Sequence, residues 1–144
     1  MGKVTVENDH DHDVAIYTLA GEIVYEEIRD AIAQYYAGTL THYTIWDFSD
    51  AVINTRFPAE EIKKLGEQVR QLGAARPTGI DYVVVHNLLQ YGLARMYYAY
   101  SEMTRSSSGP SLKTIVVRSK DDALAKIHYD AIVNVVPDTD KKAQ

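Results

Sequence analysis

Three side chains suited to acid–base or nucleophilic chemistry follow two apolar segments of the sequence. Asp47 and Ser49 come at the end of the apolar segment Tyr43–Phe48, and His86 ends the segment Asp81–His86. The carboxyl ends of parallel strands lie at one edge of a sheet, where open α/β sheets bind their ligands. An acid, a histidine and a hydroxyl are also the parts of a hydrolase triad.

Two interpretations of these residues stay open. An Asp-x-Ser sequence after a strand also satisfies backbone donors in a turn, and His86 also suits a cap or core position. A hydrolase built on a nucleophile elbow carries Gly-x-Ser-x-Gly, and this chain has no such motif. We therefore predict no catalytic residue, and we expect Asp47, Ser49 and His86 to contact a ligand or a partner.

His10 and His12 alternate with Asp9, Asp11 and Asp13, which is a composition that zinc sites use. A metal site also needs side chains that converge, and a hairpin turn scatters them. We expect a solvated turn here and predict no metal and no cofactor.

Two pairs of carboxylates, Glu26 with Glu27 and Glu60 with Glu61, fall in the first turns of expected helices. Acidic side chains stabilise that end of a helix. Adjacent helical positions point about 100° apart, so neither pair forms a facing acid–base dyad.

Tyr91, Arg95 and Tyr98 recur at helical spacing and form one face with aromatic and cationic character. This face suits a protein partner or an anionic ligand, although an ordinary half-exposed helix face has the same composition. The segment SSSGPS at 106–111 lacks the pattern of a phosphate-binding loop and is expected to be a plain loop.

Composition limits the class of protein. The net charge of −5 argues against a nucleic-acid partner, and the absence of cysteine excludes disulfides and thiolate chemistry. The first ten residues, MGKVTVENDH, have no apolar core of a signal peptide, and no apolar run is long enough to span a bilayer. We expect a cytoplasmic protein.

Hydrophobic periodicity predicts an α/β protein of one domain, with its core at about 14–136 and a tail at 137–144. An N-terminal hairpin of strands Lys3–Glu7 and Val14–Leu19 precedes three helix–strand units and a last helix that Pro137 is expected to end. The expected helices begin near Ile23, Pro58, Leu88 and Ser119, and the expected strands are Tyr43–Phe48, Asp81–His86 and Leu112–Arg118. The order β-β-α-β-α-β-α-β-α requires a mainly parallel mixed sheet that is covered by helices.

Four segments carry a resemblance to a known family. They are LAGEIVYEEIRDAI at 19–32, IWDFSDA at 45–51, AEEIKKLGEQV at 59–69 and YGLARMYYAYSE at 91–102. In this order they are similar to the STAS domains of anti-sigma-factor antagonists, and in detail to the SpoIIAA-like branch (STAS/SEC14). The resemblance implies a SpoIIAA-like fold and a regulatory role through other proteins.

One segment departs from that resemblance. Phosphorylatable antagonists carry an Asp-Ser-Ser-Gly-like motif at the start of the second helix, where this chain has VINTRFPAEE at 52–61. Thr55 is the one hydroxyl there and the one candidate phosphosite. We predict that the family's phosphoserine switch is absent.

Three functions follow from these observations. The first is a non-enzymatic STAS-like interaction or regulatory module that forms a homodimer, since 11 tyrosines against 2 phenylalanines favour half-buried surfaces. The second is a binder of a small apolar or lipid-like ligand, as the SEC14 side of the resemblance implies. The third is a hydrolase that uses Ser49 and His86.

Overall fold

The computed structural model describes residues 2–53, 58–103 and 111–143. Its strands are β1 (Lys3–Asp9), β2 (Val14–Ile23), β3 (Tyr43–Ile53), β4 (Thr78–Val84) and β5 (Ser111–Val117). Its helices are α1 (Tyr25–Ala37), α2 (Ala59–Leu72), the short 3-10 helix η1 (Gly73–Ala75), α3 (Leu88–Met103) and α4 (Lys120–Ala143). The predicted order of strands and long helices is confirmed.

The five strands form one sheet in the order β1-β2-β3-β4-β5. β1 is antiparallel to β2, and every other neighbouring pair is parallel. The hairpin therefore lies at one edge and β3 at the centre, as the sequence predicts. The predicted α/β fold class is confirmed, with a mainly parallel mixed sheet.

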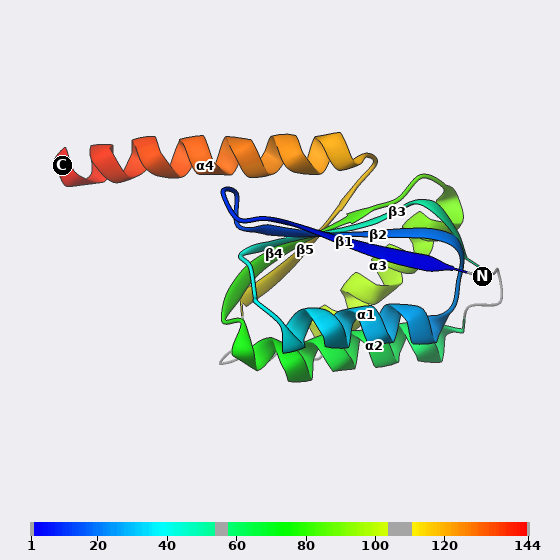
Figure 1. Ribbon diagram of the computed structural model, residues 1–144. Helices are drawn as coiled ribbons and strands as arrows, with labels where there is room; N and C mark the ends of the chain where they lie inside the picture. Colours follow the sequence, from blue (N-terminus) through cyan, green and yellow to red (C-terminus); the bar gives the residue numbers. More distant parts are fainter. Residues whose placement is uncertain (1, 54–57, 104–110, 144) are drawn as a thin grey trace.

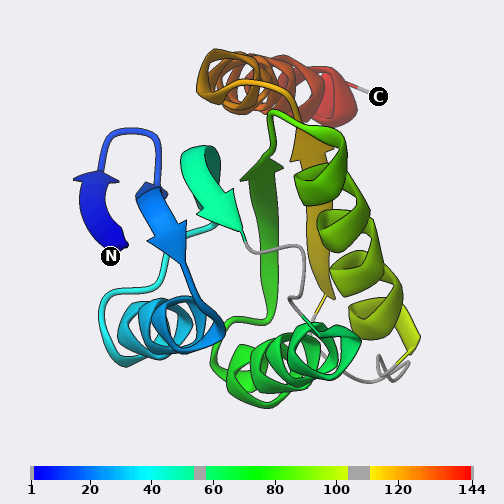
Figure 2. The same cartoon turned by 90° about the vertical axis from the view of Figure 1, so that its right-hand side faces the viewer.

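Helices cover both faces of this sheet. α1 and α2 lie on one side and α4 on the other (Figure 1), and the view after a quarter turn shows the same separation (Figure 2). The first face packs Tyr17 and Leu19 of β2 against Ile28 and Ile32 of α1. The second packs Ile45, Tyr82 and Val84 of the central strands against Ala123 and Ile127 of α4, among other residues.

The helix starts follow the local chemistry that the sequence indicates. The Val24 amide donates to the Glu27 carboxylate at 3.1 Å, so one of the paired glutamates closes the first turn of α1. The Ser119 hydroxyl accepts a hydrogen bond from the Asp122 amide at 3.0 Å and caps α4.

Several element boundaries differ from the prediction, and β4 spans Thr78–Val84 instead of Asp81–His86. β2 continues past the expected break at Gly21, which adopts φ 78°, a conformation that glycine reaches without steric cost. β3 continues to Ile53 instead of ending at Phe48. α4 runs through Pro137 to Ala143, so the prediction that Pro137 ends this helix is wrong.

Candidate functional site

Asp47 and Ser49 lie inside β3 and not at its end, which corrects the sequence prediction. The pairing with β2 shifts register here, because Thr18 and Ala20 pair with Asp47 and Asp50, so β3 contains an extra residue. The buried Asp47 carboxylate accepts the Ser49 amide at 2.9 Å and also the Ser49 hydroxyl. These contacts satisfy donors at the irregularity, which is the structural alternative that the sequence left open.

His86 follows β4 and is exposed. Its backbone amide donates to Gln90 Oε1 at 3.0 Å, and the Asn87 side chain accepts the Gln90 amide at 2.8 Å. Asn87 thus caps α3, and the segment around His86 starts that helix.

The parts of a hydrolase triad are not brought together. Within the ranges that the structure describes, no hydrogen bond joins His86 to Ser49 or to Asp47. The Ser49 hydroxyl is instead bonded to Asp47 directly, with no histidine between them. The geometry therefore gives the hydrolase hypothesis no support.

The Asp9–Asp13 turn is organised by hydrogen bonds. Asp9 accepts the backbone amides of Asp11 and His12 at 3.1 and 3.3 Å, and its other oxygen lies 2.8 Å from His12 Nδ1. The His12 contact lowers the pKa of Asp9. The part of the chain that is described contains no group of three or more His, Asp or Glu side chains arranged to hold a metal ion.

The outer surface of α3, which we define as Leu88, Tyr91, Arg95 and Tyr98, is exposed. The exposed fraction is 88% for Leu88, 44% for Tyr91 and 43% for Tyr98. Arg95 lies over the Tyr91 ring with Cζ 5.8 Å from the centroid, and its Nη1 donates to the Tyr91 hydroxyl at 3.5 Å. The predicted aromatic and cationic face therefore exists as an accessible surface. Thr55, the candidate phosphosite, lies outside the described residues.

A cavity of about 100 Å³ lies beneath α3, between the first face of the sheet and helices α1 and α2. Trp46 of β3 and the tyrosines Tyr35, Tyr36 and Tyr97 contribute to its wall, together with Thr44, Arg76, Asp81 and Gln90. Among the described residues, the rest of the lining is apolar and comprises Ile28, Ile32, Phe48, Ile53, Ile62, Leu65, Val69, Val83, Val85, Leu93 and Ala94. An apolar pocket with a few polar groups is the usual form of a small-molecule site.

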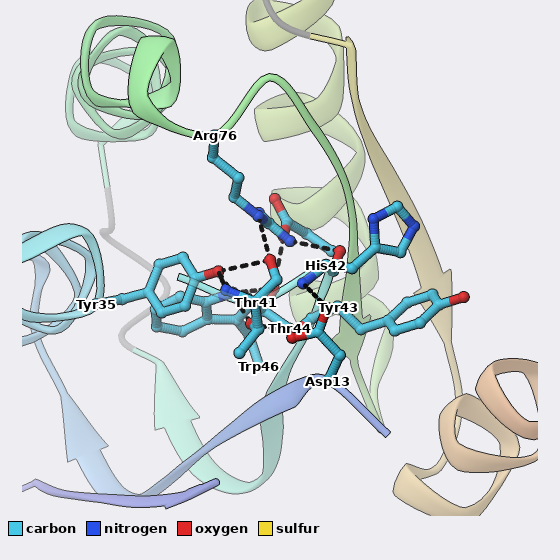
Figure 3. Close-up of polar contacts among 9 residues, drawn as sticks. Asp13, Tyr35, Thr41, His42, Tyr43, Thr44, Trp46 and Arg76 are labelled. Carbon is cyan, nitrogen blue, oxygen red and sulfur yellow. Dashed lines mark hydrogen bonds and ion pairs between the residues drawn. The ribbon is translucent and has the colours of Figure 1, made fainter. Parts of the chain in front are cut away.

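The polar part of this wall is built on Arg76, of which only 3% is exposed. Its Nη1 donates to Asp81 Oδ1 at 2.6 Å, while Nε and Nη2 donate to the carbonyls of Thr41 and His42 at 2.8 Å each. Figure 3 shows the guanidinium reaching the Thr41–His42 segment beside Tyr35. Burial acts to lower the pKa of Arg76, but the charge and hydrogen bond of Asp81 outweigh it, so the pKa is raised.

Thr44 extends the same network into the cavity wall. Its hydroxyl donates to Asp81 Oδ1 at 2.6 Å and accepts a hydrogen bond from Trp46 Nε1 at 2.9 Å. Trp46 is partly buried and stacks on Tyr17 with ring centroids 4.4 Å apart. The rings and the ion pair thus fix one another's positions.

Two of the cavity tyrosines are strongly affected by their surroundings. Burial, with the charge of Asp81 next, raises the pKa of Tyr36 to about 12. The same two causes raise the pKa of Tyr97. Both phenols are therefore neutral at neutral pH.

The sequence interpretation missed Arg76, Asp81 and Gln90. Arg76 lies in a segment that resembles a plain loop, and its carbonyl partners are 34 and 35 positions away in sequence. Gln90 donates to the carbonyls of Phe48 and Ala51 at 2.9 and 3.0 Å, past the last residue of β3 that pairs with β4. The one sequence signal for the position of Asp81 is the period of two in a strand, which puts Asp81 on the same face as Val83.

Comparisons with known proteins inform the fold. No protein-family model matches the sequence, and no curated protein matches it. An anti-sigma factor antagonist from Mycobacterium paratuberculosis has a similar structure, with TM-score 0.54 and 16% identity over 89% of this chain and 95% of that one.

Two further solved structures agree with it. One is an uncharacterized protein of the DUF3478 family with a SpoIIAA-like fold from Shewanella loihica PV-4, with TM-score 0.52 and 15% identity over 88% of this chain and 93% of that one. The other is the anti-sigma factor antagonist SpoIIAA in its unphosphorylated form, with TM-score 0.51 and 12% identity over 88% and 98%. This chain has the SpoIIAA-like STAS fold that its sequence resembles.

Proposed function

We propose that this chain is a non-enzymatic STAS-like interaction module that acts through the outer surface of α3. The exposure of Leu88, Tyr91 and Tyr98 on one side of one helix is the observation that carries the proposal. Large apolar and aromatic side chains left together at a surface are characteristic of interaction sites. Two solved neighbours are named anti-sigma factor antagonists, which supports a role through protein partners.

The partner that we propose for this surface is a second copy of the chain. A symmetric dimer uses the same patch twice, so the rings of one copy cover those of the other. Native mass spectrometry of protein purified from its own host tests this. A dimer that survives dilution to low micromolar concentration supports the proposal, and a monomer at high micromolar concentration contradicts it.

The absence of cysteine and the net charge of −5 support a proposal about where the module acts and what it does not bind. We place the module in the reducing environment of the cytoplasm, without a nucleic-acid partner. None of the helices in the described ranges has the length and apolar composition needed to cross a membrane.

The cavity favours a second function, the binding of a small apolar ligand. Its volume of about 100 Å³ and its mostly apolar lining are the supporting observation. The same native spectra test it, because a retained small molecule adds its mass to that of the protein.

A matched pair of variants separates a ligand in the cavity from one bound elsewhere. Ala94 lines the cavity and Ala99 is exposed on the same helix. Ala94→Leu fills part of the space and is expected to remove the added mass, whereas Ala99→Leu keeps it. An added mass that survives Ala94→Leu contradicts binding in the cavity.

A further inference from the structure

The cavity has one polar corner, formed by Asp81 and Tyr97. Asp81 Oδ1 is used twice, by Arg76 Nη1 and by the Thr44 hydroxyl, both at 2.6 Å. Across the described ranges, no donor is hydrogen-bonded to Asp81 Oδ2. The Asp81 side chain is only 11% exposed, so solvent does little to satisfy that oxygen.

Tyr97 brings a second incomplete group to the same wall. It lines the cavity from α3, and its hydroxyl forms no hydrogen bond with any residue that the structure describes. Asp81 lines the same cavity, and its charge contributes to the raised pKa of Tyr97. Both groups line the cavity, so each can form a hydrogen bond with a ligand there.

The corner selects against anions. Each guanidinium nitrogen of Arg76 already donates to a protein oxygen, one of them on Asp81. Among the described residues of the lining, the one cation, Arg76, is already paired with Asp81, so an entering carboxylate would lie beside a second carboxylate, and like charges in a buried site repel strongly. A neutral hydroxyl can donate a hydrogen bond to Asp81 Oδ2 and accept one from the Tyr97 hydroxyl, so it can bond to both groups at once.

We infer that the cavity recognises a small neutral apolar molecule that carries one hydroxyl group, bound between Asp81 and Tyr97. The inference rests on the proposed ligand-binding function and adds the class of ligand. The volume of about 100 Å³ sets its size. For comparison, an engineered apolar cavity of about 150 Å³ accepts benzene. This cavity is smaller, so its occupant is limited to a short-chain alcohol or a single small ring such as phenol, and a complete lipid does not fit.

Three probes of one shape test the inference, namely phenol, toluene and benzoate. Each is titrated into the protein at neutral pH by calorimetry, and the fluorescence of Trp46, the one tryptophan of the chain, reports entry into the cavity. Two additional hydrogen bonds are expected to make phenol bind about 10-fold more tightly than toluene. Benzoate is expected to bind at least about 10-fold more weakly than phenol, by the same conversion.

Variants locate the recognition. Tyr97→Phe keeps the ring and removes the hydroxyl, so it should lower the affinity for phenol several-fold and leave the affinity for toluene unchanged. Tyr129→Phe, on the exposed side of α4, is the matched control and should change neither.

The possible results are distinguishable. Equal affinity for phenol and toluene in the wild-type protein contradicts the recognition of a hydroxyl group. It does not contradict the binding of an apolar ligand in the cavity. Benzoate that binds as tightly as phenol also contradicts the recognition of a hydroxyl group, as does a phenol-to-toluene ratio unchanged by Tyr97→Phe. If none of the three probes binds, both the inference and the ligand-binding function fail.

Discussion

At the residue scale, Arg76 organises the polar part of the cavity wall. It joins the start of β4 to the segment between α1 and β3 through Asp81 and the carbonyls of Thr41 and His42. A buried ion pair contributes little net stability, but the loss of one partner leaves an uncompensated charge. Its role is therefore to fix the corner of the cavity in one arrangement.

Replacement of this arginine should be costly. Arg76→Met leaves the buried Asp81 carboxylate without its counter-ion and removes one donor from each of two carbonyls, so we expect it to lower the free energy of unfolding by about 3–5 kcal/mol. Urea denaturation measures the change. Arg70→Met, at an exposed position of α2, is the control and should stay within about 0.5 kcal/mol of wild type. If Arg76→Met changed the free energy of unfolding as little as Arg70→Met does, the contacts of Arg76 would not stabilise the fold.

Gly79 is a glycine because Arg76 occupies the adjacent space. A Cβ at position 79 would lie 2.5 Å from Arg76 Cζ, and that guanidinium is fixed by three hydrogen bonds. We expect Gly79→Ala to destabilise the protein by about 1–3 kcal/mol, the usual cost of overpacking. Thermal unfolding followed by circular dichroism checks this, and a variant as stable as wild type would mean that Arg76 can move aside.

The buried phenols predict a dependence on alkaline pH. Burial raises the pKa of Tyr36 and of Tyr82 to about 12, whereas an unfolded tyrosine titrates near pH 10. The neutral phenols therefore stabilise the fold fully below about pH 10, and this contribution is lost as the pH rises toward about 12.

Urea denaturation between neutral pH and about pH 12 should show this decline in the free energy of unfolding. Tyr36→Phe removes one of the two groups and should make the decline less steep. Tyr129→Phe, at an exposed position, is the control. If the free energy of unfolding declined equally in Tyr36→Phe and in wild type, the pKa of Tyr36 would be the same in the folded and the unfolded protein.

At the element scale, the sequence predicts the order of elements more accurately than their ends. Apolar runs at strand length and stripes at helix spacing are local signals, and they predict five strands and four long helices correctly. The end of β3 depends on pairing with β2 and on Gln90, which is distant in sequence. The contacts of Arg76 also join residues that are distant in sequence, so the polar part of the cavity could not be predicted from local patterns.

α3 offers a test in which an alanine should be favourable. Gly92 lies inside this helix, and a Cβ added there meets no atom within 4 Å. Alanine has a better helix propensity than glycine, so Gly92→Ala should raise the free energy of unfolding by about 0.5–1 kcal/mol. Together with Gly79→Ala it forms a pair of identical substitutions with opposite expected signs. A loss of stability in Gly92→Ala would contradict the open space around this position.

At the scale of the whole molecule, self-association is the property that the exposed rings predict. Tyr98→Glu would place a charge against its own copy in a symmetric dimer, so the variant should dissociate while its circular dichroism stays that of wild type. Sedimentation velocity measures the association. Tyr129→Glu, on α4, is the control and should leave the dimer intact if the outer surface of α3 forms the contact. Dissociation of Tyr129→Glu alone would move the interface to α4.

The position of α3 between the cavity and the solvent has a thermodynamic consequence. Leu93, Ala94 and Tyr97 face the cavity from the same helix whose outer surface carries Tyr91 and Tyr98. If a molecule in the cavity shifts this helix, it changes the affinity of the outer surface by some factor, and linkage requires the partner to change the affinity of the cavity by the same factor. The two proposed functions would then be one coupled equilibrium, in which a small molecule sets how much of the protein is assembled.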